Sequence, residues 1–451
     1  MRAQEMRSLL FLALTLYLRL IFGGIRLIIS LTIQGQRFMD ICTFLEKSYT
    51  AYHTALNCQF ILEKNGFEQL SLDKEWNLSI GGKYYVTKND SAVIAFKVGE
   101  NFAFNIAESH TDSPCLKVKG NTLVQSPEGA RVNVEEYGGL ILYSMLDAPL
   151  KIAGRILEKH GDKLVSKVVE SKYAVSIPSL AIHHNPTVNN GMALSVQKDM
   201  LPLLGYTEDV YSTLSKEEVV DADLYVVPAT APYYSGVNCE YLCSPRIDNL
   251  TSVFTSVQAI TKCNPKNIAL ACCFDNEEVG SRTKQGANSA LLRNVLKKIA
   301  RGLNKNKDEF ISACENGFIL SIDNGHAMHP AFPEKSDVTQ KVFLNGGVVI
   351  KHHTNYATDA FSSAVVKTLL DKAGVKHQDY YNHSDLRCGS TIGLMTSANL
   401  AMNACDIGLA QLAMHSAVET VGATDIDDMQ NCIDAFFDCA IVQKGQNIEI
   451  K

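Results

Sequence analysis

Two adjacent carboxylates, Glu277 and Glu278, are the first residues in this chain whose types and spacing suggest chemistry. They follow an apolar run, 268–273, whose length and composition are typical of a buried strand. Neighbouring side chains on a strand point to opposite faces, so both glutamates can serve one site only where the strand ends. The Val-Gly-Ser sequence at 279–281 predicts such a turn. Because a lone Glu-Glu pair is more often a solvated acidic turn, the interpretation depends on the rest of the chain.

The ends of other predicted elements supply the remaining groups that a metal site needs, namely His110, Asp248, Asp323 and His415. In an α/β protein the polar tips of successive strands meet at one edge of the sheet. Imidazole and carboxylate ligands suit zinc. Two metal ions about 3.5–4 Å apart need a bridging carboxylate and can activate water, and a further, unligated carboxylate must accept the proton. Together with the two glutamates, these groups fit five ligands and one general base.

The elements that must position these groups alternate between strand and helix, which predicts an α/β fold. Apolar spacing predicts strands at 102–107, 268–273, 318–322 and 348–350, and a hairpin over 76–98 that turns at Gly81-Gly82. Helical spacing predicts helices at 39–65, 250–260, 291–303 and 360–373, and a helical segment that begins at 411–416.

Residues 117–237 differ in sequence pattern from the rest of the chain. Short β-like runs, such as 140–143 and 163–165, are separated by turn residues, and no long helix is evident. We therefore expect a β-rich domain inserted between the first part of a catalytic domain, 39–116, and its second part, 238–451. Within the insert, only the stretch around His183 contains residue types that are plausible in a catalytic site. On sequence alone, a histidine pair on the protein surface is the favoured interpretation of this stretch.

Composition narrows the class of protein further. The chain has 451 residues, 46% hydrophobic and 20% charged, with a net charge of -6, which gives no indication of nucleic-acid binding. Thirteen cysteines are scattered without paired zinc-ribbon spacing. We interpret them as reduced thiols of a cytoplasmic protein.

The segment 1–38 is apolar and leaves three interpretations open. Residues 9–33 follow Arg2 and Arg7 and resemble a membrane anchor. However, Arg19 and Arg26 lie inside the segment, where a charge is costly in a bilayer. The alternatives are a natural start at Met39, with 1–38 as a mis-assigned upstream extension, or an amphipathic segment at a membrane surface.

Six motifs together resemble the aspartyl aminopeptidase family of dinuclear zinc exopeptidases. They are Ser-His-Thr-Asp-Ser-Pro at 109–114, Arg-Ile-Asp-Asn at 246–249, Asp-Asn-Glu-Glu-Val-Gly-Ser at 275–281, Asp323 with His-Ala-Met-His-Pro at 326–330, Cys-Gly-Ser-Thr-Ile-Gly at 388–393, and Gln-Leu-Ala-Met-His-Ser at 411–416. The resemblance runs in order from about Met39 and omits only the N-terminal segment.

This resemblance implies a role for each matching residue. Asp248 would bridge two zinc ions, His110 and Asp323 would complete one site, and Glu278 and His415 would complete the other. Glu277 would be the general base, and Asp112 would orient His110. The resemblance also implies a catalytic domain with a central mixed sheet flanked by helices, and a β-rich domain used for oligomerisation. Family members form tetrahedral dodecamers in which a histidine like His183 reaches the site of a neighbouring subunit.

The implied substrates are peptides that lose their N-terminal residue, which many family members prefer to be Asp or Glu. Lys351, at the tip of the 348–350 strand, is our candidate for binding an acidic side chain, with a solvated strand-end lysine as the alternative. The chain departs from the family pattern at 137–140 and 146–149, where an expected Arg is missing. Three alternatives therefore stay open: a preference for neutral N-terminal residues, a catalytically silent zinc-binding scaffold, and a membrane-anchored protein with another role.

Overall fold

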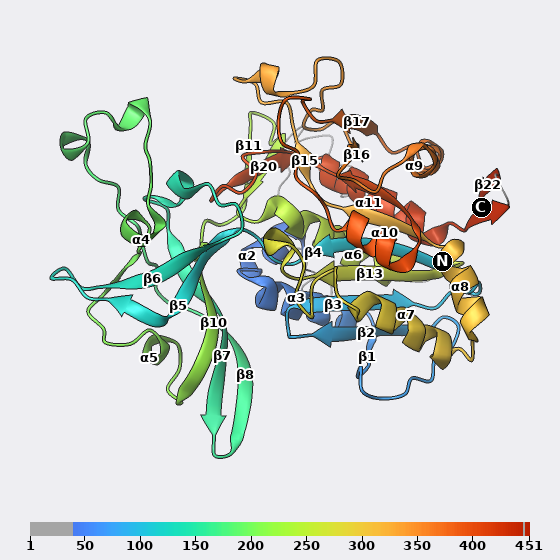
Figure 1. The fold of residues 1–451 in the computed structure, drawn as a ribbon, viewed down its shortest axis with the longest axis horizontal. Helices are drawn as coiled ribbons and strands as arrows, with labels where there is room; N and C mark the ends of the chain where they lie inside the picture. Colours follow the sequence, from blue (N-terminus) through green and yellow to red (C-terminus); the bar gives the residue numbers. More distant parts are fainter. Residues whose placement is uncertain (1–38, 445–446) are drawn as a thin grey trace, which may run out of the picture.

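The computed structural model describes residues 39–444 and 447–451. Its centre is a nine-stranded sheet with the order β1-β2-β3-β13-β4-β14-β18-β16-β17 (Figure 1). Strands β13, β4, β14 and β18 are parallel, whereas β3 and β16 pair antiparallel with β13 and β18. The expected α/β fold with a central mixed sheet is therefore confirmed. The strands are β1 (Glu68–Gln69), β2 (Lys83–Lys88), β3 (Ala92–Lys97), β4 (Phe104–His110), β13 (Ile268–Phe274), β14 (Phe318–Ile322), β16 (Val348–His352), β17 (His377–Tyr381) and β18 (Asn403–Gly408).

Helices cover both faces of this sheet. Successive side chains of β13 alternate between two hydrophobic cores: Ala269 and Ala271 belong to one, Leu270 and Cys272 to the other. Because both faces are covered, the whole of β13 is buried, which explains its uninterrupted apolar sequence. The first core is closed by α2 (Ile41–Lys47), α3 (Ala51–Lys64), α6 (Ile247–Lys262), α9 (Ala360–Ala373) and α11 (Asp425–Asp438), and the second by α7 (Leu291–Gly302), α8 (Lys307–Glu315) and α10 (Gly393–Leu400).

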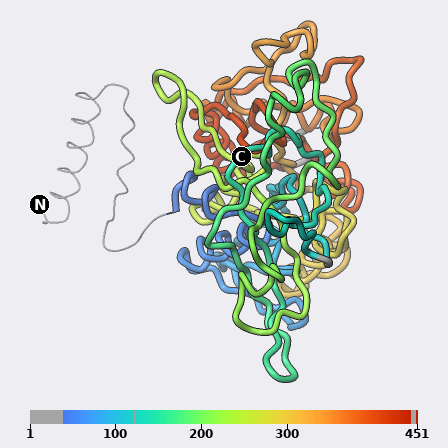
Figure 2. Tube along the Cα trace, turned by 90° about the vertical axis from the view of Figure 1, so that its left-hand side faces the viewer, coloured from blue at the N-terminus to red at the C-terminus, as the bar shows by residue number. Residues whose placement is uncertain are grey.

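A separate six-stranded antiparallel sheet projects to one side of the central sheet (Figure 1). Its strands lie in the order β8-β7-β10-β5-β6-β9, and its buried residues form a hydrophobic core of their own. The β7–β8 hairpin extends away from the molecule, as Figure 2 shows from the side. The strands are β5 (Cys115–Val124), β6 (Ala130–Tyr137), β7 (Leu150–His160), β8 (Lys163–Glu170), β9 (Leu203–Gly205) and β10 (Val219–Pro228).

A five-stranded sheet and several short elements complete the described structure. The five-stranded sheet has the order β11-β12-β20-β19-β15, and β21 (Ile441–Lys444) pairs with β22 (Asn447–Ile450). The strands of the five-stranded sheet are β11 (Tyr233–Ser235), β12 (Tyr241–Ser244), β15 (Gly325–His326), β19 (Ala410–Leu412) and β20 (Glu419–Gly422). The short helices are α4 (Val196–Asp199), α5 (Tyr211–Leu214), η1 (Leu142–Met145), η2 (Ile182–His184), η3 (Val188–Asn190), η4 (Glu277–Val279) and η5 (Pro333–Lys335).

Two predicted N-terminal elements are corrected. The single helix expected over 39–65 is two helices, α2 and α3, because Ser48 and Thr50 both have non-helical backbone angles. Polar side chains of this kind favour helix ends over helix interiors. The hairpin turns at Asn89-Asp90 rather than at the glycine pair 81–82. Asn89 and Asp90 both have φ 57, a left-handed conformation, in the three-residue connection 89–91 between the paired Lys88 and Ala92.

Two further local predictions are wrong. The run 140–143, expected as a strand, leads into the 3₁₀ helix η1. The segment 411–416, expected to begin a helix, instead contains the end of β19 followed by a turn. Ala413 and His415 there have φ 54 and 67, and left-handed residues cannot continue a right-handed helix.

The interpretations of residues 1–38, including the anchor over 9–33 and a start at Met39, fall on a segment that lies outside the described residues. Within 39–444 and 447–451, no helix has the length and apolar character needed to cross a membrane.

Candidate metal centre

Three neighbouring strands of the central sheet deliver polar residues to one edge. The parallel register pairs Phe274, the last residue of β13, with His110, the last residue of β4. Glu277 and Glu278 come after the end of β13, with two residues between, and Asp323 follows β14 on the other side of β4. The carboxyl ends of these strands therefore meet in one pocket of about 510 Å³, as expected for an α/β sheet.

Within this pocket the side chains form three groups that could each hold a metal ion: His110 with Glu277 and Glu278, and two groups that share Asp248. His110 Nε2 lies 3.5 Å from Asp248 Oδ1 and 3.6 Å from Asp323 Oδ1. His415 Nε2 lies 3.5 Å from Asp248 Oδ2 and 3.3 Å from Glu278 Oε1. Asp248 belongs to both groups and turns one carboxylate oxygen toward each.

The chemistry of these groups fits divalent cations such as zinc. Asp248 is buried, yet its Oδ1 has no hydrogen-bond partner, an arrangement that is costly unless a cation or a water molecule binds there. Burial lowers the pKa of His415, but Asp248 and Glu278 outweigh this and raise it to about 11. Burial likewise opposes ionisation of Asp248, but the His110 and His415 imidazoles hold its pKa below the usual range. The site therefore attracts positive charge, and imidazole with carboxylate is a donor set that zinc prefers.

Asp112 contacts residues of all three groups, although it belongs to none of them. The Nδ1 of His110 lies 3.0 Å from the backbone carbonyl of Asp112, which leaves Nε2 facing the other ligands. The Asp112 carboxylate accepts the backbone N–H groups of Glu277 and Glu278 at 3.1 and 3.2 Å. Such partners around a metal ligand fix its orientation.

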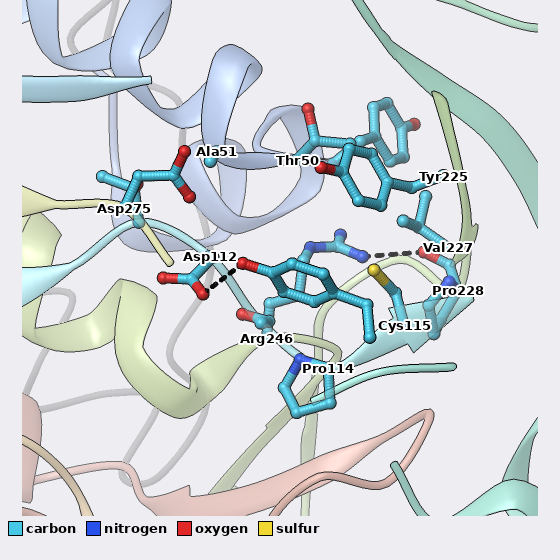
Figure 3. Close-up of a pocket in the computed structure, with 14 residues that line it drawn as sticks. Thr50, Ala51, Asp112, Pro114, Cys115, Tyr225, Val227, Pro228, Arg246 and Asp275 are labelled. Carbon is cyan, nitrogen blue, oxygen red and sulfur yellow. Dashed lines mark hydrogen bonds between the residues drawn. The ribbon is translucent and has the colours of Figure 1, made fainter. Parts of the chain in front are cut away.

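Asp112 also lines a second cavity, of about 30 Å³, together with Tyr137 and Arg246. Figure 3 shows Asp112 and Arg246 in the wall of this cavity. The Tyr137 hydroxyl donates to Asp112 Oδ2 at 2.7 Å, and the Arg246 guanidinium donates to the carbonyl of Pro228 at 2.9 Å. Tyr137 ends β6 and Pro228 ends β10, so the six-stranded sheet contacts Asp112, which follows β4, and Arg246, which precedes α6.

Glu277 lines the same pocket and lies close to His110 and Glu278. Burial raises its pKa well above the usual value, although His110 opposes the shift. It follows Asn276, whose φ of 63 starts the tight turn η4. A carboxylate with a raised pKa beside a metal centre is suited to accept and return a proton.

One residue of the site, Glu419, was missed by sequence reasoning. Its Oε2 accepts the backbone N–H of Asp248 at 3.0 Å, and its Oε1 accepts the backbone N–H of His415 at 2.6 Å. Burial, followed by the charge of Asp248, raises the pKa of Glu419 to about 8. The only signal in the sequence is a glutamate that follows the apolar pair 417–418, which does not identify its partners.

The structure also places the two remaining residues that the sequence singled out. The buried Lys351 ammonium lines the pocket and donates to the carbonyls of Asp323 and Asn324 at 2.9 and 3.1 Å. It also lies 3.4 Å from Asp323 Oδ2. His183 is exposed in η2, on the six-stranded-sheet side of the chain, and does not line the metal-binding pocket of its own subunit.

Comparison with known proteins identifies the family. A family model described as Aminopeptidase I zinc metalloprotease (M18) matches residues 44–437. A probable M18 family aminopeptidase 2 from Clostridium novyi (strain NT) is 39% identical over 411 residues, covering 86% of this chain and 95% of that protein. Its counterpart in Ectopseudomonas mendocina (strain ymp) is 32% identical over 416 residues, covering 87% of this chain and 96% of that one.

Solved structures agree with this match. The cryo-EM structure of the Ape4 and Nbr1 complex has a TM-score of 0.84 at 30% identity and covers 88% of this chain and 84% of that one. The S. cerevesiae mApe1 dodecamer has a TM-score of 0.76 at 26% identity and covers 88% of this chain and 95% of that one. The family resemblance seen in the sequence motifs is therefore confirmed: the chain belongs to the M18 family of zinc metallo-aminopeptidases.

Proposed function

We propose that this protein is a dinuclear zinc aminopeptidase that releases the N-terminal residue of peptides. The observation that carries the proposal is the position of Asp248, whose two oxygens face two separate ligand groups. His110 and Asp323 would hold one ion, and Glu278 and His415 the other. When bound, the zinc pair supplies Lewis acidity that makes water nucleophilic at neutral pH.

In the proposed reaction Glu277 moves the proton. Its carboxylate accepts a proton from the attacking water and delivers it to the nitrogen of the leaving peptide. Asp112 sets its position, because the backbone N–H groups of Glu277 and of the ligand Glu278 are both hydrogen-bonded to the same carboxylate.

Replacing Glu277 with glutamine tests this assignment. Glu277→Gln keeps the size of the side chain but removes its capacity to take up a proton, so kcat should fall by about 10²-fold or more. The zinc content of the purified variant should stay near that of the wild type. A variant that loses zinc would show that the two adjacent glutamates have exchanged roles, a possibility raised by the grouping of His110 with both glutamates.

We propose an acidic N-terminal residue as the preferred substrate, with neutral residues as the alternative. Lys351 supplies the cation for an acidic side chain. Its 3.4 Å contact with Asp323 Oδ2 is the longest of its three polar contacts. If Asp323 turns that carboxylate toward a metal ion, the third N–H group of Lys351 becomes free for a substrate carboxylate. Kinetics of the zinc-loaded enzyme on a panel of aminoacyl chromogenic substrates decides between acidic and neutral residues.

We further propose a cytoplasmic homo-oligomer in which subunits complete one another's sites. All thirteen cysteines are free thiols, and most are buried, which suits a reducing compartment. One similar solved structure is described as a dodecamer. His183 is exposed and does not line the metal-binding pocket of its own subunit, so we assign it to the pocket of a neighbouring subunit. There it would donate a hydrogen bond to the developing oxyanion.

A further inference from the structure

A third cavity, of about 270 Å³, adjoins the metal-binding pocket. It shares His326, Tyr380 and Asn382 with the pocket that contains the metal-binding groups, so the two spaces are adjoining. The cavity is much larger than the space that one water molecule needs. The hydrolysis described above assigns no role to the residues that line its far end.

All charged side chains that line this cavity are basic. Lys335 and Arg387 carry full positive charges, three histidines accompany them, and neither Asp nor Glu contributes to the lining. Both cations are exposed, and neither forms an ion pair with a carboxylate among residues 39–444 and 447–451. In a chain whose net charge is -6, a cavity lined only by basic charged groups favours the binding of an anion.

Two of the histidines offer donors even when they are neutral. His329 Nδ1 accepts the backbone N–H of Ala331 at 3.2 Å, and His383 Nδ1 accepts the backbone N–H of Asp385 at 3.2 Å. A neutral imidazole that accepts at Nδ1 carries its proton on Nε2. The lining therefore supplies N–H donors from lysine, arginine and imidazole, which matches a ligand that only accepts hydrogen bonds, namely a carboxylate.

We propose that this cavity binds a carboxylate on the leaving side of the scissile bond. An aminopeptidase holds the first residue of the peptide at its metal centre, so the remaining residues must extend into adjoining space. The carboxylate belongs either to the C-terminus of a short peptide or to an acidic side chain that follows the first residue. Arg387 makes the principal contact, because a guanidinium can bind a carboxylate through two parallel hydrogen bonds. This inference rests on the proposed function, which places the first residue at the metals.

Two pairs of peptides with the same N-terminal residue test the proposal and separate the two sources. The first pair is a tripeptide with two following alanines, as the free acid and as the C-terminal amide. The second pair places Glu or Gln second in an amidated tripeptide. The zinc-loaded wild-type enzyme should favour the charged member of at least one pair by about 10-fold in kcat/KM, mainly through KM. The preference should shrink as salt increases.

Substitutions of residues that line the cavity then test whether the preference for the charged peptide arises there. Arg387→Gln should reduce the preference toward one, and Lys335→Gln should reduce it by a smaller factor. Lys341→Gln is the matched control, because Lys341 is exposed in the same loop but does not line the cavity. If Arg387→Gln fails to fold, as judged by circular dichroism and zinc content, Lys335→Gln alone decides the question.

Two results would overturn the inference. The first is a wild-type enzyme that cleaves all four peptides with ratios near one in both pairs, which leaves the aminopeptidase reaction itself intact. The second is a charge preference that persists unchanged in both lining variants, which assigns the carboxylate to another part of the site. If the zinc-loaded enzyme cleaves none of the peptides or chromogenic substrates, the proposed function fails and this inference fails with it.

Discussion

Replacing Glu419 with glutamine tests whether a carboxylate outside the ligand set holds the metal centre together. Its two oxygens accept the backbone N–H groups of Asp248 and His415, at 3.0 and 2.6 Å. These two residues are separated by more than one hundred and sixty positions in the chain, so Glu419 links two distant segments. A glutamine has only one acceptor oxygen at this position. Its NH₂ group must therefore face one of the two backbone N–H groups, which loses its partner in a buried site.

The size of the effect follows from these contacts. Leaving one buried donor without its acceptor costs about 1–3 kcal/mol in the free energy of unfolding. Because both N–H groups belong to proposed zinc ligands, we also expect a loss of about 10–100-fold in zinc affinity, the usual effect of removing a partner of a metal ligand.

Denaturant unfolding of the zinc-free protein and chelator competition on the zinc-loaded protein measure the two effects separately. Glu315→Gln, at the exposed end of α8, is the control for loss of a glutamate charge. A Glu419→Gln protein with wild-type zinc affinity would refute the argument that these hydrogen bonds position the ligands, even if its stability fell. Wild-type values in both assays would show that an amide satisfies both N–H groups.

Three further predictions concern the ligands, the pocket and the assembly. Asp248→Ala should lose both zinc ions after dialysis whereas His110→Ala loses chiefly one, and equal zinc content in the two variants would contradict the bridging role of Asp248. Lys351→Met should reduce turnover of substrates with N-terminal Asp far more than of those with Leu; a uniform loss would instead indicate that Lys351 serves mainly to hold Asp323. Mixing inactive Glu277→Gln and His183→Phe subunits should restore part of the activity if His183 acts across subunits, and no recovery despite proven subunit exchange would confine each site to one chain.

The sequence predicted the parts of the site that depend on strand ends. His110, Glu277, Glu278 and Asp323 each follow an apolar run, and parallel strands with short polar tips bring such residues together. The same reasoning fails for Glu419, because its role depends on two backbone N–H groups that only the folded chain brings near.

Local sequence patterns also gave a wrong prediction where tertiary contacts determine the backbone conformation. The apolar and small residues at 411–416 suggested a helix, but the segment pairs with neighbouring strands, and His415 takes a left-handed conformation. The structure holds it there through the bond from its backbone N–H to Glu419 and a 3.0 Å contact between its Nδ1 and the carbonyl of Gly139. Unusual backbone angles of this kind persist at functional sites because surrounding contacts fix them.

Asp112 explains how two adjacent glutamates can serve one centre with different roles. On a continuing strand Glu277 and Glu278 would point to opposite faces. The strand β13 stops at Phe274, and the left-handed Asn276 starts a tight turn in which both glutamate N–H groups point at the Asp112 carboxylate. Asp112 also lies against His110 Nδ1, so one side chain sets the orientation of a histidine ligand and of both glutamates. The proposed division into ligand and base therefore depends on this turn, which the Asp112 carboxylate holds while it accepts a hydrogen bond from the Tyr137 hydroxyl.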